Sequence, residues 1–430
     1  MKSNKFTRRI FLTSATLIAG VAAFPAPSFL RAQNLNSKLN VGCIGIGGRG
    51  QYNVNGVRGE NIITVCDVDK RQLDKFNIKL QDTAKFSDYR KMFDKFGDKL
   101  DAVTVSTPDH THAAISITAM KLGINCYTEK PLAHNVNETQ QMIKIAKEKN
   151  LKTQMGIQIH SQQNYPRVVE LIQAGAIGKI NEVHIWVDKA WGGRPIPKGE
   201  FDVPEYLDWD AWLGPAAFRA YNPCYVPGGW RSYWAFGTGT LGDMACHFFD
   251  LPYWALGLRR PAKIEASGPP VDPECCPLGL TVKFEYPKTD KHEALTLTWY
   301  DNKVRPKLIK EKGLPNWKNG VIFVGSEGLL LSDYDKHILY PEEKFKDYKR
   351  PDKSIPPSQG HYAEWLQAIK NNKTTSCNFD YSGIMTEAIL LGVIAYRTNK
   401  KLTWDETTLK TNNAEANAML ISTQRKGWEF

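Results

Sequence analysis

Val41-Gly42-Cys43-Ile44-Gly45-Ile46-Gly47-Gly48-Arg49-Gly50 follows a short apolar run and contains the spacing G-x-G-x-x-G. Between a strand and a helix, glycines at this spacing permit a tight turn, close approach of the backbone to a pyrophosphate, and close helix–strand packing. Amide donors at the start of the helix then meet the phosphates. The stretch predicts a parallel α/β sheet with a dinucleotide site built on Gly45, Gly47 and Gly50.

The nature of the dinucleotide is indicated by Asp67, which ends the second expected strand 22 residues after Gly45. A carboxylate there accepts hydrogen bonds from both ribose hydroxyls and repels a 2′-phosphate, so NAD is favoured over NADP. Lys70 and Arg71 keep NADP as the alternative, because a cation just after the acid can hold a phosphate. Thr107 and Glu129, each just after a further strand, are the remaining cofactor candidates because ligands bind at the carboxyl ends of parallel strands.

Strands and helices alternate through residues 40–155, which predicts a Rossmann domain. The expected strands are Lys38–Ile46, Asn61–Val68, Asp101–Ser106 and Asn125–Thr128, and the expected helices are Gln72–Gln81, His112–Leu122 and Val136–Glu148.

From residue 156 to 430 successive strands are joined by turns, which predicts a second α/β domain with an open, mostly antiparallel sheet. Its expected strands are Ile180–Asp188, Leu280–Tyr286, Leu295–Trp299, Gly320–Val324 and Gly328–Asp333, and its expected helices are Tyr165–Ala174, Leu241–Leu256, Gly360–Lys370 and Tyr381–Asn399. Ala190–Arg231 is long and rich in Pro and Gly, as binding loops often are.

Residues 1–32 resemble a twin-arginine export signal, with Arg8-Arg9-Ile10-Phe11-Leu12 before an apolar run that is short for a membrane span. An ordinary secretory signal is the alternative. Cleavage after Ala32 leaves an arm, residues 33–39, before the first strand. The prediction is a periplasmic or otherwise exported protein with no stable membrane span after processing.

Composition argues against several classes of partner. The formal charge is +11, and removing residues 1–32, which hold five basic side chains and no acid, leaves +6 without a basic block. Nucleic acid is therefore not an expected partner. The eight cysteines show no zinc spacing, and His110 and His112 lack carboxylate or thiol partners at metal spacing, so no metal is expected.

Three side chains have the types needed for hydride transfer from an alcohol. Lys130 lies in Glu129-Lys130-Pro131, while Asp243 and His247 are four residues apart and so share one helix face. The histidine can take the hydroxyl proton, the aspartate can orient the imidazole, and the lysine can hydrogen-bond the developing oxyanion.

Together the glycine fingerprint, Asp67, Thr107-Pro108, Glu129-Lys130-Pro131 and the pair Asp243 and His247 resemble the Gfo/Idh/MocA oxidoreductase family over nearly the whole mature chain. The resemblance implies catalytic Lys130 and His247 supported by Asp243, a sugar or cyclitol substrate, and a homo-oligomer (dimer or tetramer) formed by the second domain. Exported relatives retain their cofactor. Other relatives are NAD-dependent glycosidases, in which the Glu-Lys-Pro motif is often altered; here it is intact.

Substrate-binding candidates come from the second domain. Seven of the 12 tryptophans fall between residues 186 and 254, and indoles stack on sugar rings. The nearest candidates to Asp243 are Trp230, Arg231 and Trp234, and weaker ones are His160, Tyr165 and Arg167. The expected function is oxidation or reduction of a secondary hydroxyl of a sugar, cyclitol or glycoside. The alternatives are glycoside cleavage through transient oxidation and a non-catalytic carbohydrate- or cofactor-binding module.

Overall fold

The structure is a computed structural model that describes residues 38–76 and 83–430. The expected export signal and residues 33–37 of the arm lie outside the described residues, so both stay predictions. Of the arm, only Lys38 and Leu39 are described, and the Leu39 amide donates to the Glu60 carboxylate at 2.7 Å.

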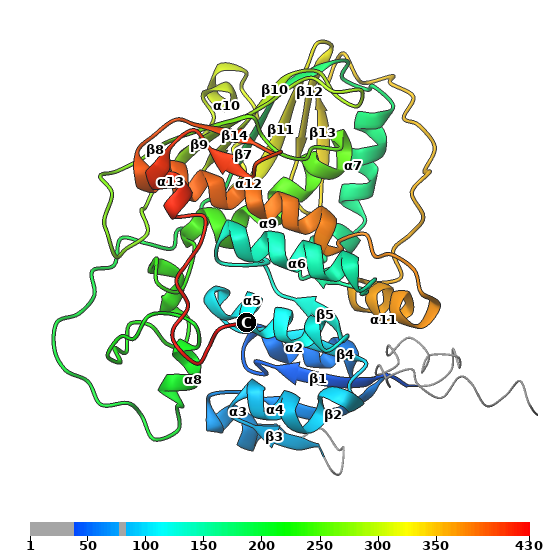
Figure 1. The fold of residues 1–430 in the computed structure, drawn as a ribbon. Helices are drawn as coiled ribbons and strands as arrows, with labels where there is room; N and C mark the ends of the chain where they lie inside the picture. Colours follow the sequence, from blue (N-terminus) through cyan, green and yellow to red (C-terminus); the bar gives the residue numbers. More distant parts are fainter. Residues whose placement is uncertain (1–37, 77–82) are drawn as a thin grey trace, which may run out of the picture. The chain divides into compact units, whose positions relative to one another are not determined.

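The first half of the described chain forms a six-stranded sheet in the order β3-β2-β1-β4-β5-β6 (Figure 1). Every neighbouring pair is parallel. The strands are β1 (Asn40–Ile44), β2 (Asn61–Cys66), β3 (Ala84–Phe86), β4 (Ala102–Val105), β5 (Asn125–Thr128) and β6 (Gln154–Met155). The Rossmann arrangement expected from the glycine turn is confirmed. Strand order reverses between β1 and β4, which is where such sheets bind ligands.

The helices of this half are α2 (Arg49–Val57), α3 (Lys70–Lys75), α4 (Tyr89–Phe96), α5 (Asp109–Lys121) and α6 (Val136–Glu148). The bounds of α6 match the expected ones because a capping box fixes its start: Asn135 accepts from the Glu138 amide, and the Glu138 carboxylate accepts from the Asn135 amide. The short strands β3 and β6 and the helix α4 were not predicted from the sequence. The expected helix Gln72–Gln81 corresponds to α3, which ends at Lys75, and residues 77–81 lie outside the described residues. With three residues, none of them buried, β3 carries little periodic signal.

A nine-stranded sheet forms the second half, in the order β13-β12-β11-β7-β10-β9-β8-β14-β15. All its pairs are antiparallel except β7 with β10, which confirms the expected mostly antiparallel sheet. The strands are β7 (Ile180–Trp186), β8 (Lys263–Ser267), β9 (Thr281–Tyr286), β10 (Leu295–Tyr300), β11 (Gly320–Gly325), β12 (Gly328–Ser332), β13 (His337–Tyr340), β14 (Leu402–Asp405) and β15 (Lys410–Thr411).

Two long helices, α9 (Gly239–Leu256) and α12 (Phe379–Thr398), pack on one face of this sheet, and α6 packs against α12 from the other side (Figure 1). By length and hydropathy α12 passes the test for a membrane-spanning helix, but 89% of that window is buried inside the protein. Its apolar character is accounted for by its place in the core. The helices α7 (Asn164–Gln173), α10 (Lys307–Glu311), α11 (His361–Asn371) and α13 (Ala414–Ala418) complete the half.

The long segment 190–231 contains only α8 (Trp209–Leu213) and part of a 3₁₀ turn, Gly229–Ser232. It forms an aromatic core of its own, separate from the main one, in which Trp209 stacks on Trp212 with ring centroids 4.7 Å apart. Packing of these aromatic side chains therefore holds residues 190–231 in a defined conformation although the segment has few backbone hydrogen bonds.

Candidate active site

A cavity of about 1010 Å³ is lined by the glycine turn after β1, by the ends of β2, β4 and β5, and by the segment 190–231 and α9. The cavity therefore joins the predicted nucleotide site to Lys130, Asp243 and His247, all of which line it.

The glycine turn fits a dinucleotide because its backbone packs so closely against neighbouring backbone that a side chain at Gly45 or Gly50 would clash. Gly45 has φ +75°, and a Cβ there would lie 2.7 Å from the Ser106 carbonyl oxygen. A Cβ on Gly50 would lie 1.7 Å from the Gly45 carbonyl oxygen. Gly45 is thus required by the turn and Gly50 by the contact between α2 and β1. Gly45 and Gly47 line the cavity.

Asp67 lines the same cavity, and it also supports the turn. Its Oδ2 accepts from the Ile46 and Gly47 amides at 2.9 and 3.3 Å, and its Oδ1 accepts from the Asp69 amide at 2.9 Å. Burial raises the pKa of Asp67, which these amides partly oppose. Oδ1 therefore keeps an acceptor site for a ribose hydroxyl, whereas both sites of Oδ2 are already used by backbone amides.

Arg71 is one of the two cations that left NADP as the alternative cofactor, and its side chain already contacts other residues of the protein. Its guanidinium donates to both oxygens of Asp69 at 3.0 and 2.7 Å and lies 3.4 Å from the centroid of the Tyr206 ring. These contacts favour NAD, because a 2′-phosphate would have to compete with Asp69 for the arginine.

Thr107 and Glu129 also line the cavity, at the ends of β4 and β5. The carboxylate of Glu129 is held by three donors, with Oε1 at 3.1 Å from Arg49 Nε, 3.0 Å from Asn53 Nδ2 and 3.1 Å from Gln158 Nε2. Glu129 therefore ties α2 to the second half of the chain.

Lys130 and Asp243 form a buried ion pair between the two halves. Lys130 Nζ lies 2.8 Å from Asp243 Oδ1 and 2.6 Å from the Asp243 carbonyl oxygen. Burial alone would lower the pKa of Lys130, but the charge of Asp243 outweighs it and raises the pKa. The lysine is therefore charged at neutral pH and can donate to an oxyanion.

Asp243 receives two further donors. Arg231 Nε lies 3.0 Å from Oδ1, and Trp191 Nε1 donates to Oδ2 at 2.8 Å. Although burial would raise the pKa of Asp243, Lys130 and Arg231 hold it well below the usual range. The expectation that Asp243 orients the imidazole is wrong: among the described residues its carboxylate bonds the lysine, the arginine and the indole, and not His247.

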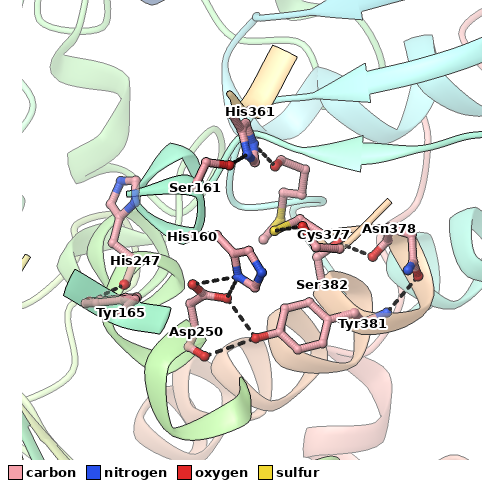
Figure 2. A network of polar contacts seen from close by, with 12 residues as sticks. His160, Ser161, Tyr165, His247, Asp250, His361, Cys377, Asn378, Tyr381 and Ser382 are labelled. Atoms are coloured by element: carbon pink, nitrogen blue, oxygen red, sulfur yellow. Dashed lines mark hydrogen bonds and ion pairs between the residues drawn. The ribbon is translucent and has the colours of Figure 1, made fainter. Parts of the chain in front are cut away.

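His247 is held through its backbone rather than its ring. The hydroxyl of Tyr165 donates to the His247 carbonyl oxygen at 2.9 Å (Figure 2), and Nδ1 is buried with no hydrogen-bond partner in residues 38–76 and 83–430. Burial, with the nearby Lys130 charge, lowers the pKa of His247 to about 3. The imidazole is therefore neutral at neutral pH and able to accept a proton.

Two regions of the sequence match family models of oxidoreductases. Residues 39–157 match the NAD-binding Rossmann fold of the Gfo/Idh/MocA family, and residues 181–430 match its C-terminal α/β domain. The chain belongs to the Gfo/Idh/MocA oxidoreductase family. The NAD-binding assignment of the first domain follows from this match.

The chain is similar to several members with named activities. It is 27% identical over 171 residues to levoglucosan dehydrogenase of Pseudarthrobacter phenanthrenivorans, covering 40% of this chain and 36% of that one. It is 29% identical over 180 residues to inositol 2-dehydrogenase of Salmonella typhimurium, covering 39% and 50%. A glycosyl hydrolase family 109 protein of Shewanella pealeana is 29% identical over 159 residues, 33% of each chain. The matched segments thus span only a third to a half of these relatives.

Solved structures of family members share the fold. The WlbA dehydrogenase of Bordetella pertussis, in complex with NADH and UDP-GlcNAcA, aligns with a TM-score of 0.61 at 15% identity, covering 86% of this chain and 99% of that one. Levoglucosan dehydrogenase in complex with NADH and levoglucosan aligns with a TM-score of 0.57 at 17% identity, covering 85% and 99%.

Four of the six substrate candidates do not line the cavity of this Gfo/Idh/MocA protein. Tyr165 is fully buried beneath α9. Arg167 pairs with Glu170 at 2.7 Å, and Trp234 Nε1 donates to the Asp272 carbonyl oxygen at 3.0 Å. The expectation that these three residues and His160 bind substrate is therefore corrected. They were chosen for nearness in sequence to a strand end or to Asp243, which does not determine where a side chain points. Trp230 and Arg231 do line the cavity.

His160 lies instead in a buried polar cluster (Figure 2). Its Nδ1 is 2.8 Å from Asp250 Oδ1, and the Tyr381 hydroxyl donates to the same oxygen at 2.7 Å. Burial would lower the pKa of His160, but Asp250 outweighs it and raises the pKa. With Cys377, His160 and Asp250 place three ligand atoms within 4.8 Å of one another. His160 and Asp250 already pair with each other, so neither side chain needs a metal as a partner. The expected absence of a metal stays a prediction.

Trp191, Lys189 and Tyr334 are among the cavity residues that were not predicted from the sequence. Trp191 was one of seven tryptophans with no feature to single it out. Lys189 and Tyr334 follow the strands β7 and β12 within three residues, so position after a strand end was the usable signal. The Tyr334 hydroxyl is buried with no partner in the described part of the chain.

Proposed function

We propose that this protein is an exported, NAD-dependent oxidoreductase that oxidises or reduces a secondary hydroxyl of a sugar, cyclitol or glycoside and keeps its cofactor bound. The observation that carries the proposal is one cavity lined by both the glycine turn and the residues Lys130, Asp243 and His247. A non-catalytic binding module would have no need of the buried lysine–aspartate pair.

In the oxidation direction, bound NAD supplies the acceptor for the hydride that leaves the carbinol carbon. Lys130 donates a hydrogen bond to the alcohol oxygen and stabilises the charge that develops there. The neutral imidazole of His247 takes the hydroxyl proton. Asp243, held by Lys130, Arg231 and Trp191, keeps the lysine charged and in position. The reduction of a ketone reverses these roles.

Retention of the cofactor is supported by residues 204–227, here called the cofactor strap. The strap crosses from the second half of the chain to the end of β2: the Lys70 amide donates to the Tyr206 carbonyl oxygen at 2.8 Å, and the Asp208 amide donates to Val68 at 2.9 Å. Strap residues that line the cavity are Tyr206, Leu207, Ala211, Trp212, Tyr221, Pro223, Val226 and Pro227. A dinucleotide beneath this strap would leave only when the strap detaches.

Export through Arg8 and Arg9 supplies the reason for retention. A twin-arginine signal directs folded proteins, so the cofactor pocket can be filled in the cytoplasm before transport. Outside, a dehydrogenase that released NADH would stop after one turnover. The protein would therefore alternate between oxidising one substrate and reducing another, which gives ping-pong kinetics. Assembly into a homo-oligomer is part of the same proposal and is checked by light scattering.

The test is turnover of purified, cofactor-loaded mature protein with pairs of sugars and no added nucleotide. We expect many turnovers per bound nicotinamide, identified as NAD by mass spectrometry. A strict requirement for added NAD, with NADH accumulating in solution in step with product, would overturn retention. Tyr206→Ala should speed cofactor release, whereas the matched variant Phe218→Ala, at a strap residue that is 73% exposed, should not. Deletion of residues 33–39 tests the arm in the same assay.

A second candidate, glycoside cleavage through transient oxidation and elimination, is favoured by the similarity to the glycosyl hydrolase family 109 protein. The intact Glu129-Lys130-Pro131 gives slight preference to net oxidoreduction. Release of the aglycone from nitrophenyl glycosides, with no second sugar and no net change in the bound nicotinamide, would establish the cleavage reaction instead.

A further inference from the structure

The substrate part of the cavity carries an excess of positive charge. Lys130, Lys189 and Arg231 line it against one strongly acidic carboxylate, Asp243, and the neighbouring Arg49 and Glu129 balance each other as an ion pair at 3.1 Å. The other acid near it, Asp109, is 1% exposed and accepts from the Thr238 hydroxyl, and burial raises its pKa to about 7. The charge of Lys130 is matched by Asp243, which leaves Lys189 and Arg231 without a full counter-charge.

Arg231 is held in place with its outer face unused. Its Nε bonds Asp243 at 3.0 Å, and its guanidinium carbon lies 4.2 Å from the centroid of the Trp230 ring. Its two terminal nitrogens make no hydrogen bond to any residue in 38–76 or 83–430. A guanidinium with one edge fixed and one edge free suits a planar oxyanion.

Lys189 lacks a partner because its neighbour is already paired. Asp188, the adjacent acid, forms an ion pair with Arg305, and no carboxylate in the described part of the chain lies within ion-pair distance of Lys189 Nζ. Lys189 nevertheless acts on the reaction centre, since its charge is among those that lower the pKa of His247. Lys189 is exposed and also lines the cavity, so its ammonium group is accessible to a substrate.

We infer that the substrate is a sugar acid, whose carboxylate binds between Arg231 and Lys189 while its reacting hydroxyl lies at Lys130 and His247. This inference rests on the proposed oxidoreductase function and names its substrate class. The free guanidinium edge matches the two coplanar oxygens of a carboxylate, and Lys189 supplies a second positive charge beside it. A bound carboxylate also offsets the cations around His247, which makes the imidazole a stronger base.

The experiment compares matched pairs of sugars in cofactor-loaded protein. The probes are methyl glucuronide and methyl galacturonide, the corresponding methyl hexosides, and the 6-phosphates of glucose and galactose. Reduction of the bound nicotinamide gives kcat/KM, and quenching of tryptophan fluorescence gives affinity without turnover. We expect a preference of about 10- to 100-fold for the uronides over the hexosides, the range of a charge-assisted bidentate contact.

Substitution locates the carboxylate site. Lys189→Gln should reduce the preference for uronide over hexoside by about tenfold, and Lys189→Glu should reduce it further. Lys198→Gln is the matched control, because Lys198 is an exposed lysine nearby in sequence that does not line the cavity. Since Lys189 is exposed, these variants should fold, and circular dichroism checks this.

The possible outcomes distinguish failure of the sugar-acid inference from failure of the proposed oxidoreductase function. Hexosides turned over as well as uronides would overturn the sugar-acid substrate and leave the oxidoreductase standing. A preference for the 6-phosphates would overturn the carboxylate in favour of a dianion. If no probe is turned over, the oxidoreductase function fails for this panel, and the binding measurement still decides: equal affinity for uronide and hexoside, or an unaltered preference in Lys189→Gln, contradicts the site.

Discussion

The nucleotide part and the substrate part of the cavity are built in opposite ways. One side of the nucleotide part comes from a single local unit, β1, the glycine turn and α2, together with Asp67 after β2, and Thr107, Glu129 and the cofactor strap line the rest. The substrate part gathers residues from across the chain: Lys130, Lys189, Trp191, Trp230, Arg231, Asp243, His247 and Tyr334. Local geometry therefore fixes how the cofactor binds, whereas long-range packing fixes what reacts with it. Variants in the two parts should have separable effects.

The largest effect is expected from the substrate part. Lys130→Met and His247→Gln should each lower the rate of hydride transfer by roughly 10²- to 10⁴-fold, because each removes a group that handles the proton or the oxyanion. The bound NAD content should stay at the wild-type level. Single-turnover absorbance of the nicotinamide measures the rate, and mass spectrometry measures the content. A near-normal rate in both variants would place the chemistry elsewhere.

A smaller effect, and of the opposite kind, is expected from the nucleotide part. Asp67→Ala should weaken NAD binding by about 10- to 100-fold and narrow the preference over NADP, since it removes the ribose acceptor and the bonds to Ile46 and Gly47. Hydride transfer in the NAD-saturated variant should change little. Calorimetric titration with both nucleotides provides the measurement, and unchanged affinity for both would contradict the assignment of Asp67.

A modest effect should sharpen the comparison within the substrate part. Trp191→Phe keeps a ring but removes the hydrogen bond to Asp243 Oδ2, so kcat should fall by about 3- to 10-fold with NAD content unchanged. Trp234→Phe is the matched control, because it removes an indole hydrogen bond, to the Asp272 carbonyl oxygen, at a residue outside the cavity. Equal losses in the two variants would mean that Trp191 acts only through stability.

A change of pH should be the least selective perturbation, because it should affect the stability of both halves through buried histidines. Burial lowers the pKa of His110 to about 3 and that of His134 and His361 to about 4. In the unfolded chain these histidines take up protons near pH 6.5, so the folded state binds fewer protons and loses stability as the pH falls from about 6.5 to 4.

The loss of stability should be on the order of a few kcal/mol in all, and the raised pKa of His160 opposes it in part. Thermal unfolding followed across this range measures it. A midpoint that stays constant or rises as the pH falls would contradict the buried neutral histidines.

The same difference between the two parts explains what the sequence could predict. β5 and α6 have the expected bounds, and the glycine turn lies where the spacing placed it, because strand–turn–helix geometry is local. That Asp243 and His247 share one face of α9 was also predictable, because they are four residues apart. That the Asp243 carboxylate faces Lys130 and Arg231 instead of the imidazole depends on where distant segments pack, which spacing does not contain.

The errors follow the same rule. His160, Tyr165 and Trp234 are aromatic and close in sequence to the predicted site, yet each is turned into the core, where its polar atom finds a partner in a distant segment. Lys189 and Tyr334 were missed because residue type guided the choice of candidates, although each follows a strand within three residues. For this cavity, a position just after a strand was a better guide than residue type.

The ion pair of Lys130 and Asp243 has a consequence for how activity arises during folding. The lysine belongs to the Rossmann half and the carboxylate to the second half, so neither half contains a working proton and oxyanion apparatus. Separately expressed halves should be inert even when the first binds NAD. Reactivity therefore requires both halves to be folded and docked, so a partly folded chain that has already bound a nucleotide should be unable to oxidise metabolites.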